Sequence, residues 1–184
     1  MIKYTYQGKE ECLKNLFSEI TIEEFEKTAA LNEGTQFYAY YLDAFEILGF
    51  SKELCDSIDT DNLIEIIKDF KKIVKQPKKL KHEFKLDGHT YEAFDAKSSV
   101  NARDFADVQK LMYQFAVNND YKWVSEAMAI IFKRTDLSAT EHKDKSHREE
   151  KANLFKIHMT MDYALPYVDK LSAEYIKNIK LFNE

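Results

Sequence analysis

The spacing of hydrophobic residues along most of the chain is that of a helix. Apolar side chains recur every three or four positions, which places them on one face of an α-helix. This spacing predicts helices over residues 21–31, 37–48, 51–58, 62–74, 102–117 and 123–132, a helical segment at 154–161, and a last helix from 171 to about 182. The segment 123–132 is apolar on nearly every side, so we expect it to be the most deeply buried helix.

Helix-capping residues support several of these boundaries. Thr21 is followed three positions later by Glu24, which is the pattern of a capping box. Ser51 is placed to cap the helix that follows it, and Gly49 suits the left-handed position after the preceding helix. We expect Pro166 to interrupt the chain before the last helix.

Two segments alternate between apolar and polar residues, as strands do. Ile2 to Gln7 predicts a short strand or an extended arm at the N-terminus. Asp87-Gly88 lies between two alternating runs, residues 81–86 and 89–94, and predicts a β-hairpin with a two-residue type I′ turn. A lone hairpin is marginally stable, so it must pack on helices or gain a third strand.

Residues 134–151 are almost free of apolar side chains, and we predict a mobile or functional loop there. This segment contains Glu141, His142, Asp144 and His147, whose spacing is tolerable for a metal. Structural metal sites favour cysteines or a rigid spacing, so we interpret the segment as a solvated loop and expect no metal and no cofactor.

These elements predict a mainly α fold: a single-domain helical bundle with one central β-hairpin. The domain spans residues 1–184, with an N-terminal helical half at 1–77, the hairpin at 78–97 and a C-terminal helical half at 98–184. The four glycines and two prolines are too few for an all-β fold rich in turns.

The aromatic content, net charge and cysteine spacing of the chain limit the classes of function that it can have. Aromatic residues make up 14% of the chain, and we expect most of them in the core, including the stripe formed by Phe37, Tyr41 and Phe45. The alternative for this stripe is an adhesive surface for a partner. A net charge of −5 argues against a protein whose whole surface binds nucleic acid, although the charge is unevenly distributed. Cys12 and Cys55 have no metal-binding spacing, and we expect two small core residues in helical surroundings.

The chain contains no recognisable catalytic motif, and we therefore expect no enzyme. Without a signal peptide or a long apolar run, we expect a cytosolic protein with no membrane contact. Lysines crowd the region between the fourth predicted helix and the hairpin. They supply most of the candidate partner-binding residues, which are Lys71, Lys72, Lys75, Lys78, Lys79, Lys81, Lys85, His142 and His147. A solvated helix end and a protected edge strand explain the lysines, and the alternative is a basic docking surface for an acidic partner or nucleic acid.

Four stretches follow one another along the chain in a recognisable order: ITIEEF at 20–25, FKLDGHTY at 84–91, DFADVQ at 104–109 and AMAIIFKR at 127–134. This layout resembles small virion-assembly proteins of tailed phages that infect Bacteroidetes, including crAss-like phages. Relatives have a Tyr-x-Asp-Leu pattern where residues 106–108 stand here, and a Tyr-Arg-Pro-like run where residues 132–134 stand, so this chain lacks the proline.

The resemblance implies a virion-associated or virion-assembly role, like that of a tail-assembly chaperone. Its partners would be other virion or assembly proteins, or further copies of the chain, in the host cytoplasm or in the particle. Our hypothesis is therefore a non-enzymatic protein that acts through protein contacts. The alternatives are an inhibitor of a host protein and an enzyme of unfamiliar type, which would need a concave pocket lined by polar groups from separate helices.

Overall fold

A computed structural model describes residues 1–31, 37–73, 79–93, 102–118, 123–138 and 140–182. The helices are α1 (Ile22–Ala29), α2 (Phe37–Ile47), α3 (Lys52–Ser57), α4 (Thr60–Ile73), α5 (Ala102–Asn118), α6 (Trp123–Ile131), the short 3₁₀ helix η1 (Glu141–Lys143), α7 (Lys145–His158) and α8 (Met161–Phe182). The strands are β1 (Ile2–Tyr6), β2 (Lys9–Leu13), β3 (Glu83–Leu86), β4 (His89–Ala93) and β5 (Phe132–Arg134).

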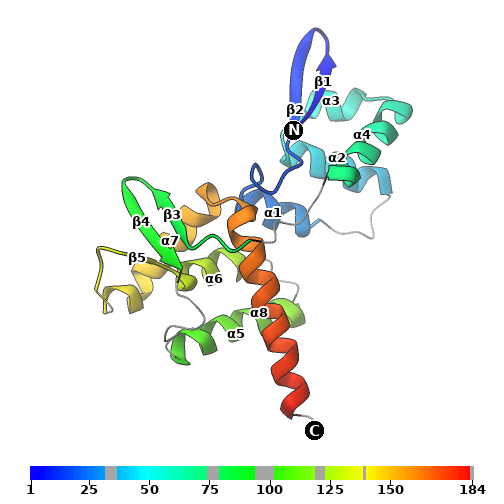
Figure 1. The fold of residues 1–184 in the computed structure, drawn as a ribbon. Helices are drawn as coiled ribbons and strands as arrows, with labels where there is room; N and C mark the ends of the chain where they lie inside the picture. The colour runs from blue at the N-terminus through cyan, green and yellow to red at the C-terminus, as the bar shows by residue number, and fades with distance from the viewer. Residues whose placement is uncertain (32–36, 74–78, 94–101, 119–122, 139, 183–184) are drawn as a thin grey trace.

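The elements lie in two groups that α1 connects (Figure 1). The N-terminal group contains β1, β2, α2, α3 and α4, and the C-terminal group contains the other strands with α5 to α8. The chain is mainly helical, as predicted. The prediction of one β-hairpin is wrong, because the described residues form both a two-stranded and a three-stranded antiparallel sheet.

The predicted helix starts at α1 and α3 are confirmed. Thr21 Oγ1 accepts from the backbone N–H of Glu24, while the Glu24 carboxylate accepts from the N–H of Thr21 over 2.9 Å. Ser51 caps α3 in the same way, by accepting from the N–H of Leu54. Each cap satisfies a backbone donor that has no partner inside the helix.

The hairpin at Asp87-Gly88 is confirmed in both turn and register. Asp87 and Gly88 have φ angles of 50° and 77°, and Leu86 pairs with His89. A third strand joins this sheet, since β5 pairs with β4 through Tyr91 and Arg134. Residues 132–134 are therefore a strand, where the apolar pattern predicted the end of a helix and the start of a loop.

A second hairpin lies at the N-terminus, where only one strand was predicted. Gln7 and Gly8 form its turn with φ angles of 48° and 77°, and β2 pairs with β1 along its whole length. Cys12 is therefore on a strand and half-buried, not in helical surroundings. Cys55 is buried in α3, burial raises its pKa to about 11, and both thiols are free.

The predicted loop at 134–151 is wrong for most of its length. A turn after β5 leads to η1, and α7 begins at Lys145. The Asp144 side chain caps α7 by accepting from the N–H of His147 over 2.9 Å. The buried face of α7 includes Lys151 beside Ala152 and Phe155, so a polar residue occupies a core position and hides the helical pattern.

The last helix also differs from its prediction. Helix α8 begins at Met161 and continues through Pro166, which does not end it. Its first N–H groups are satisfied by carbonyls far away in sequence: Met161 donates to Ile20 over 2.8 Å and Asp162 donates to Phe17 over 3.0 Å. These contacts fix the start of α8 against the segment before α1.

Aromatic rings form the centre of the C-terminal core. Phe155 is fully buried, and its ring centroid lies 5.5 Å from Phe84, 5.0 Å from Tyr91 and 6.2 Å from Phe132. Helix α7 is thereby held against the three-stranded sheet. None of the described helices has the length and apolar character needed to span a membrane.

Candidate functional site

The first candidate site is an exposed group of aromatic rings on α2. Phe37 and Tyr38 are 56% and 43% exposed, and the Phe37 ring makes edge contacts with Tyr38 at 5.5 Å and with Tyr41 at 5.0 Å. Rings occur on nearly every side of this helix, whereas the side chains that it buries are Ala44 and Phe45. The core accepts one face of α2, and the surplus rings remain at the surface.

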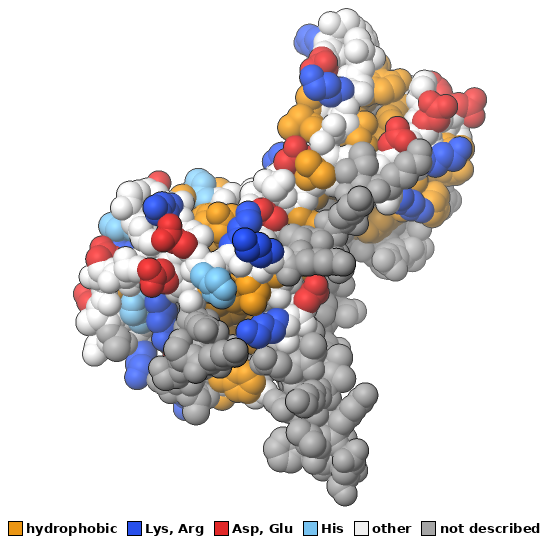
Figure 2. Space-filling view, viewed as in Figure 1, with side chains coloured by type: hydrophobic (Ala, Val, Ile, Leu, Met, Phe, Trp, Pro, Cys, Tyr) orange, Lys and Arg blue, Asp and Glu red, His pale blue; other side chains and the backbone are white. Residues whose placement is uncertain are grey.

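Lys71 of α4 completes this surface. Its Nζ lies 5.1 Å from the Phe37 ring centroid and 5.2 Å from the Tyr41 ring centroid, which is within cation–π range. We call the set Phe37, Tyr38, Tyr41 and Lys71 the aromatic face. Figure 2 shows apolar side chains exposed over the group of elements that contains α2 and α4. The core interpretation of the aromatic stripe therefore holds for Phe45 and fails for Phe37.

The other predicted lysines lie apart from the aromatic face. Lys85 is in the second hairpin, exposed and paired with Glu83 over 3.2 Å. Lys81 pairs with Asp162, and its Nζ lies 4.1 Å from the Tyr163 ring centroid. Lys79 is exposed. The side chain of Lys72, and Lys75 and Lys78 entirely, lie outside the described residues.

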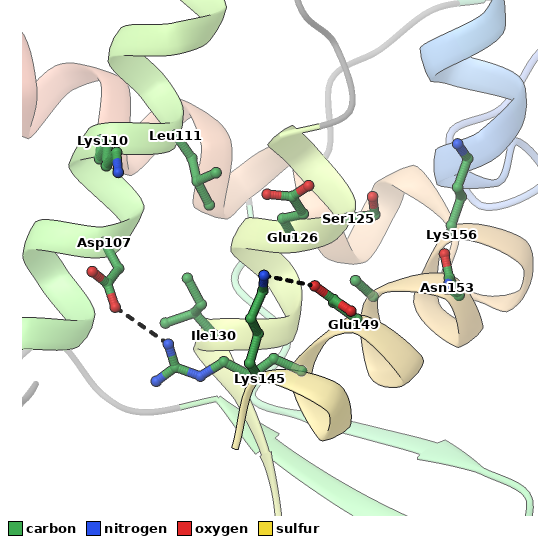
Figure 3. Close-up of a pocket in the computed structure, with 12 residues that line it drawn as sticks. Asp107, Lys110, Leu111, Ser125, Glu126, Ile130, Lys145, Glu149, Asn153 and Lys156 are labelled. Carbon is green, nitrogen blue, oxygen red and sulfur yellow. Dashed lines mark hydrogen bonds and ion pairs between the residues drawn. The ribbon is translucent and has the colours of Figure 1, made fainter. Parts of the chain in front are cut away.

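The second candidate site is a groove between α5, α6 and α7, with a volume of about 850 Å³ (Figure 3). Leu111, Ile130 and Ala152 supply its apolar part, one from each helix. Charged and polar side chains supply the rest: Asp107, Lys110, Ser125, Glu126, Lys145, Arg148, Glu149, Asn153 and Lys156. The groove is a concave pocket with polar groups from separate helices, so it keeps the enzyme alternative open.

Several charges around this groove are already paired. Arg148 Nη1 lies 3.2 Å from Asp107, and Lys145 Nζ lies 3.6 Å from Glu149. At the other end the buried Glu26 of α1 accepts from Ser125 Oγ over 3.0 Å. Lys156 Nζ also lies 3.1 Å from Glu26 Oε2, close enough for an ion pair but without hydrogen-bond geometry. Lys145 and Glu149 pair within α7, whereas the other pairs connect different helices. The Ser125 hydroxyl is turned inward toward Glu26.

A partly buried cluster of charges adjoins the groove at Arg148. We call it the basic centre: Asp104, Lys133, His142, His147, Arg148 and Lys151. Asp104 is 1% exposed and accepts from Lys133 and from Arg148, each over 2.8 Å. Burial raises the pKa of this carboxyl, but the hydrogen bond and charge of Lys133, together with those of Arg148, outweigh burial and leave the pKa below its usual value.

The two predicted histidines meet in the basic centre. His142 is buried and His147 is half-buried, and their ring centroids lie 6.3 Å apart, so the prediction of a solvated loop is wrong for this pair. Burial, together with the nearby charge of Lys151, lowers the pKa of both rings. No three described His, Cys, Asp or Glu residues are grouped so as to hold a metal ion.

Sequence patterns did not reveal Asp104 or Lys151 as members of this cluster. Lys151 lies four residues before Phe155, on the same side of α7, and that spacing is the one signal of its burial.

Comparisons of the chain with protein families, with curated proteins and with solved structures found no match.

Proposed function

We propose that the chain is a non-enzymatic protein that binds another protein through the aromatic face, as a virion component or assembly factor of a tailed phage. The observation that carries this proposal is the pair of large exposed rings, Phe37 and Tyr38, on one turn of α2. Aromatic residues are enriched in protein interfaces and provide much of their binding energy.

The exposed area of these two rings is large enough to contribute substantially to the free energy of binding a partner. About half of each side chain remains to be buried, and at about 25 cal/mol per Å² this contributes roughly 2–3 kcal/mol for each ring. Lys71 adds a positive charge beside the rings. The arrangement suits a partner surface that offers an apolar recess with a carboxylate at its edge.

The setting in virion assembly comes from the sequence resemblance. A lack of catalytic motifs supports a role without chemistry. Several polar side chains of the groove form pairs that connect two helices. Because these pairs stabilise the fold, they also support a non-enzymatic role.

Co-purification from phage-infected cells tests the proposal. The bait is the full chain, and the test variant is Phe37→Ser with Tyr38→Ser. The matched control is Tyr113→Ser, because Tyr113 is also 56% exposed but lies on α5. We expect a defined virion or assembly protein to be captured by the wild type and the control, and lost from the double variant.

Two outcomes would contradict the proposal. One is a partner retained by the double variant, which would place the contact elsewhere. The other is a chain that runs alone at every stage of infection. Circular dichroism should show the double variant folded, since both rings lie outside the core.

A further inference from the structure

The basic centre holds a buried lysine, Lys151, that forms no ion pair of its own with the described residues. Lys151 is 3% exposed, and the described residues give its Nζ neither a hydrogen bond nor an ion pair. Burial, and after it the charges of Arg148 and Lys133, lower its pKa to about 8. An amine in this position either loses its proton or requires an anion.

Asp104, which is buried, already forms ion pairs with Lys133 and Arg148. Arg148 also donates through Nε to the carbonyl of His142 over 2.9 Å and pairs with Asp107. Lys133, Arg148 and Lys151 therefore share Asp104, the buried carboxylate of the basic centre.

The imidazoles of His142 and His147 each have a buried nitrogen in this cluster. Among the described residues, His142 Nδ1 and His147 Nε2 have no hydrogen-bond partner. His147 lies four residues before Lys151, so the two side chains share one face of α7. His147 can donate through Nε2 as a neutral ring. His142 donates to the carbonyl of Arg134, so the Nδ1 of its neutral ring is a hydrogen-bond acceptor.

We propose that the basic centre is a binding site for a small oxyanion, with Lys151 as the counter-charge and His147 as a hydrogen-bond donor. Sulfate and phosphate have the charge and the several acceptor oxygens that this set of groups lacks. The site is separate from the aromatic face, so the proposal stands or fails independently of the proposed function.

Affinity should fall as pH rises. The groups that face Lys151 are Asp104 of α5, Lys133 and Arg134 of β5, and Arg148 of α7. Asp136, Glu141, Asp144 and Glu150 lie beside them and moderate the positive field. With a pKa of about 8, Lys151 loses most of its charge between pH 7 and pH 9, and anion affinity falls about tenfold over that interval.

Isothermal titration of the full chain with sulfate tests the site, because sulfate keeps its charge over this pH range. The test variant is Lys151→Met, which keeps the length of the side chain and removes its charge. The matched control is Lys145→Met on the first turn of α7, where the side chain is 91% exposed. We expect saturable binding that is retained in the control and weakened at least tenfold in Lys151→Met. Parallel titrations with phosphate and with acetate distinguish a tetrahedral oxyanion from a carboxylate.

Thermal unfolding without added anion shows whether Lys151→Met is folded, so that a loss of binding can be told from a loss of structure. Lys151→Met should be at least as stable as the wild type, because it removes a buried charge without a partner. Sulfate should raise the Tm of the wild type and leave that of Lys151→Met unchanged. The proposal is overturned if sulfate shows no saturable binding in the millimolar range, if both variants weaken binding equally, or if affinity is the same at pH 7 and pH 9.

Discussion

Replacing Asp104 by Asn should destabilise the protein strongly. The Asp104 carboxylate is the buried acceptor for both Lys133 and Arg148, and Lys151 adds a further positive charge to its surroundings. An amide of the same shape leaves these cations facing one another. Removing one member of a buried ion pair costs roughly 3–5 kcal/mol. Because Lys133 and Arg148 keep 36% and 22% of their side chains in solvent, we expect a value of about 3 kcal/mol.

Asp107→Asn is the matched control for this substitution. Asp107 lies one turn further along α5, is 32% exposed and also contacts Arg148. Partly exposed pairs contribute about 0–1 kcal/mol, so the control should lose no more than that. Urea unfolding followed by fluorescence measures both variants, because the single tryptophan, Trp123, is buried and reports on the core. A loss below about 1 kcal/mol for Asp104→Asn, or equal losses for the two variants, would refute the reasoning.

The same carboxylate predicts a pH dependence with a definite sign. The pKa of Asp104 is lowered in the folded state. Its contribution to stability is therefore fully present above the unfolded value of about 3.9 and is lost as pH falls through the lower folded value. Asp104→Asn should remove this part of the acid sensitivity, and urea unfolding at a series of pH values below about 5 measures the difference.

Two further substitutions test the packing. Phe155→Ala should lower the free energy of unfolding by roughly 3–5 kcal/mol, because Phe155 is fully buried among aromatic rings; a loss near that of an exposed residue such as Leu154 would contradict this. Gly49→Ala should destabilise by roughly 1–3 kcal/mol, because at a φ of 125° its Cβ would lie 2.7 Å from the carbonyl oxygen of Cys12. Gly88→Ala, where φ is also positive but nothing lies near, is the control and should lose less in the same unfolding measurement.

Local signals in the sequence predicted local structure well. The capping box at Thr21, the cap at Ser51 and the Asp87-Gly88 turn each involve residues a few positions apart, and each forms as expected. Strand β5 could not be predicted from local signals of this kind. Phe132 continues the apolar run of α6, and its strand conformation depends on β4, which lies about forty residues earlier.

The sites were harder to predict because they depend on contacts between distant segments. Lys151 looks like one more charged residue in a polar stretch until Phe155 places that side of α7 in the core. Lys151 is buried because α7 packs against α6, α1 and η1. Phe37 shows the opposite case: its apolar spacing suggests burial, yet the core is filled by Phe45 and leaves the Phe37 ring in solvent. Spacing alone does not say how many rings a core can hold.

Site-specific photo-crosslinking in infected cells tests the central claim most directly. A photoreactive phenylalanine derivative replaces Phe37 in one sample and the equally exposed Tyr113 in another. If the aromatic face binds a partner, position 37 yields a discrete adduct with one phage protein and position 113 yields none. No adduct at position 37, or the same adducts at both positions, would contradict the account.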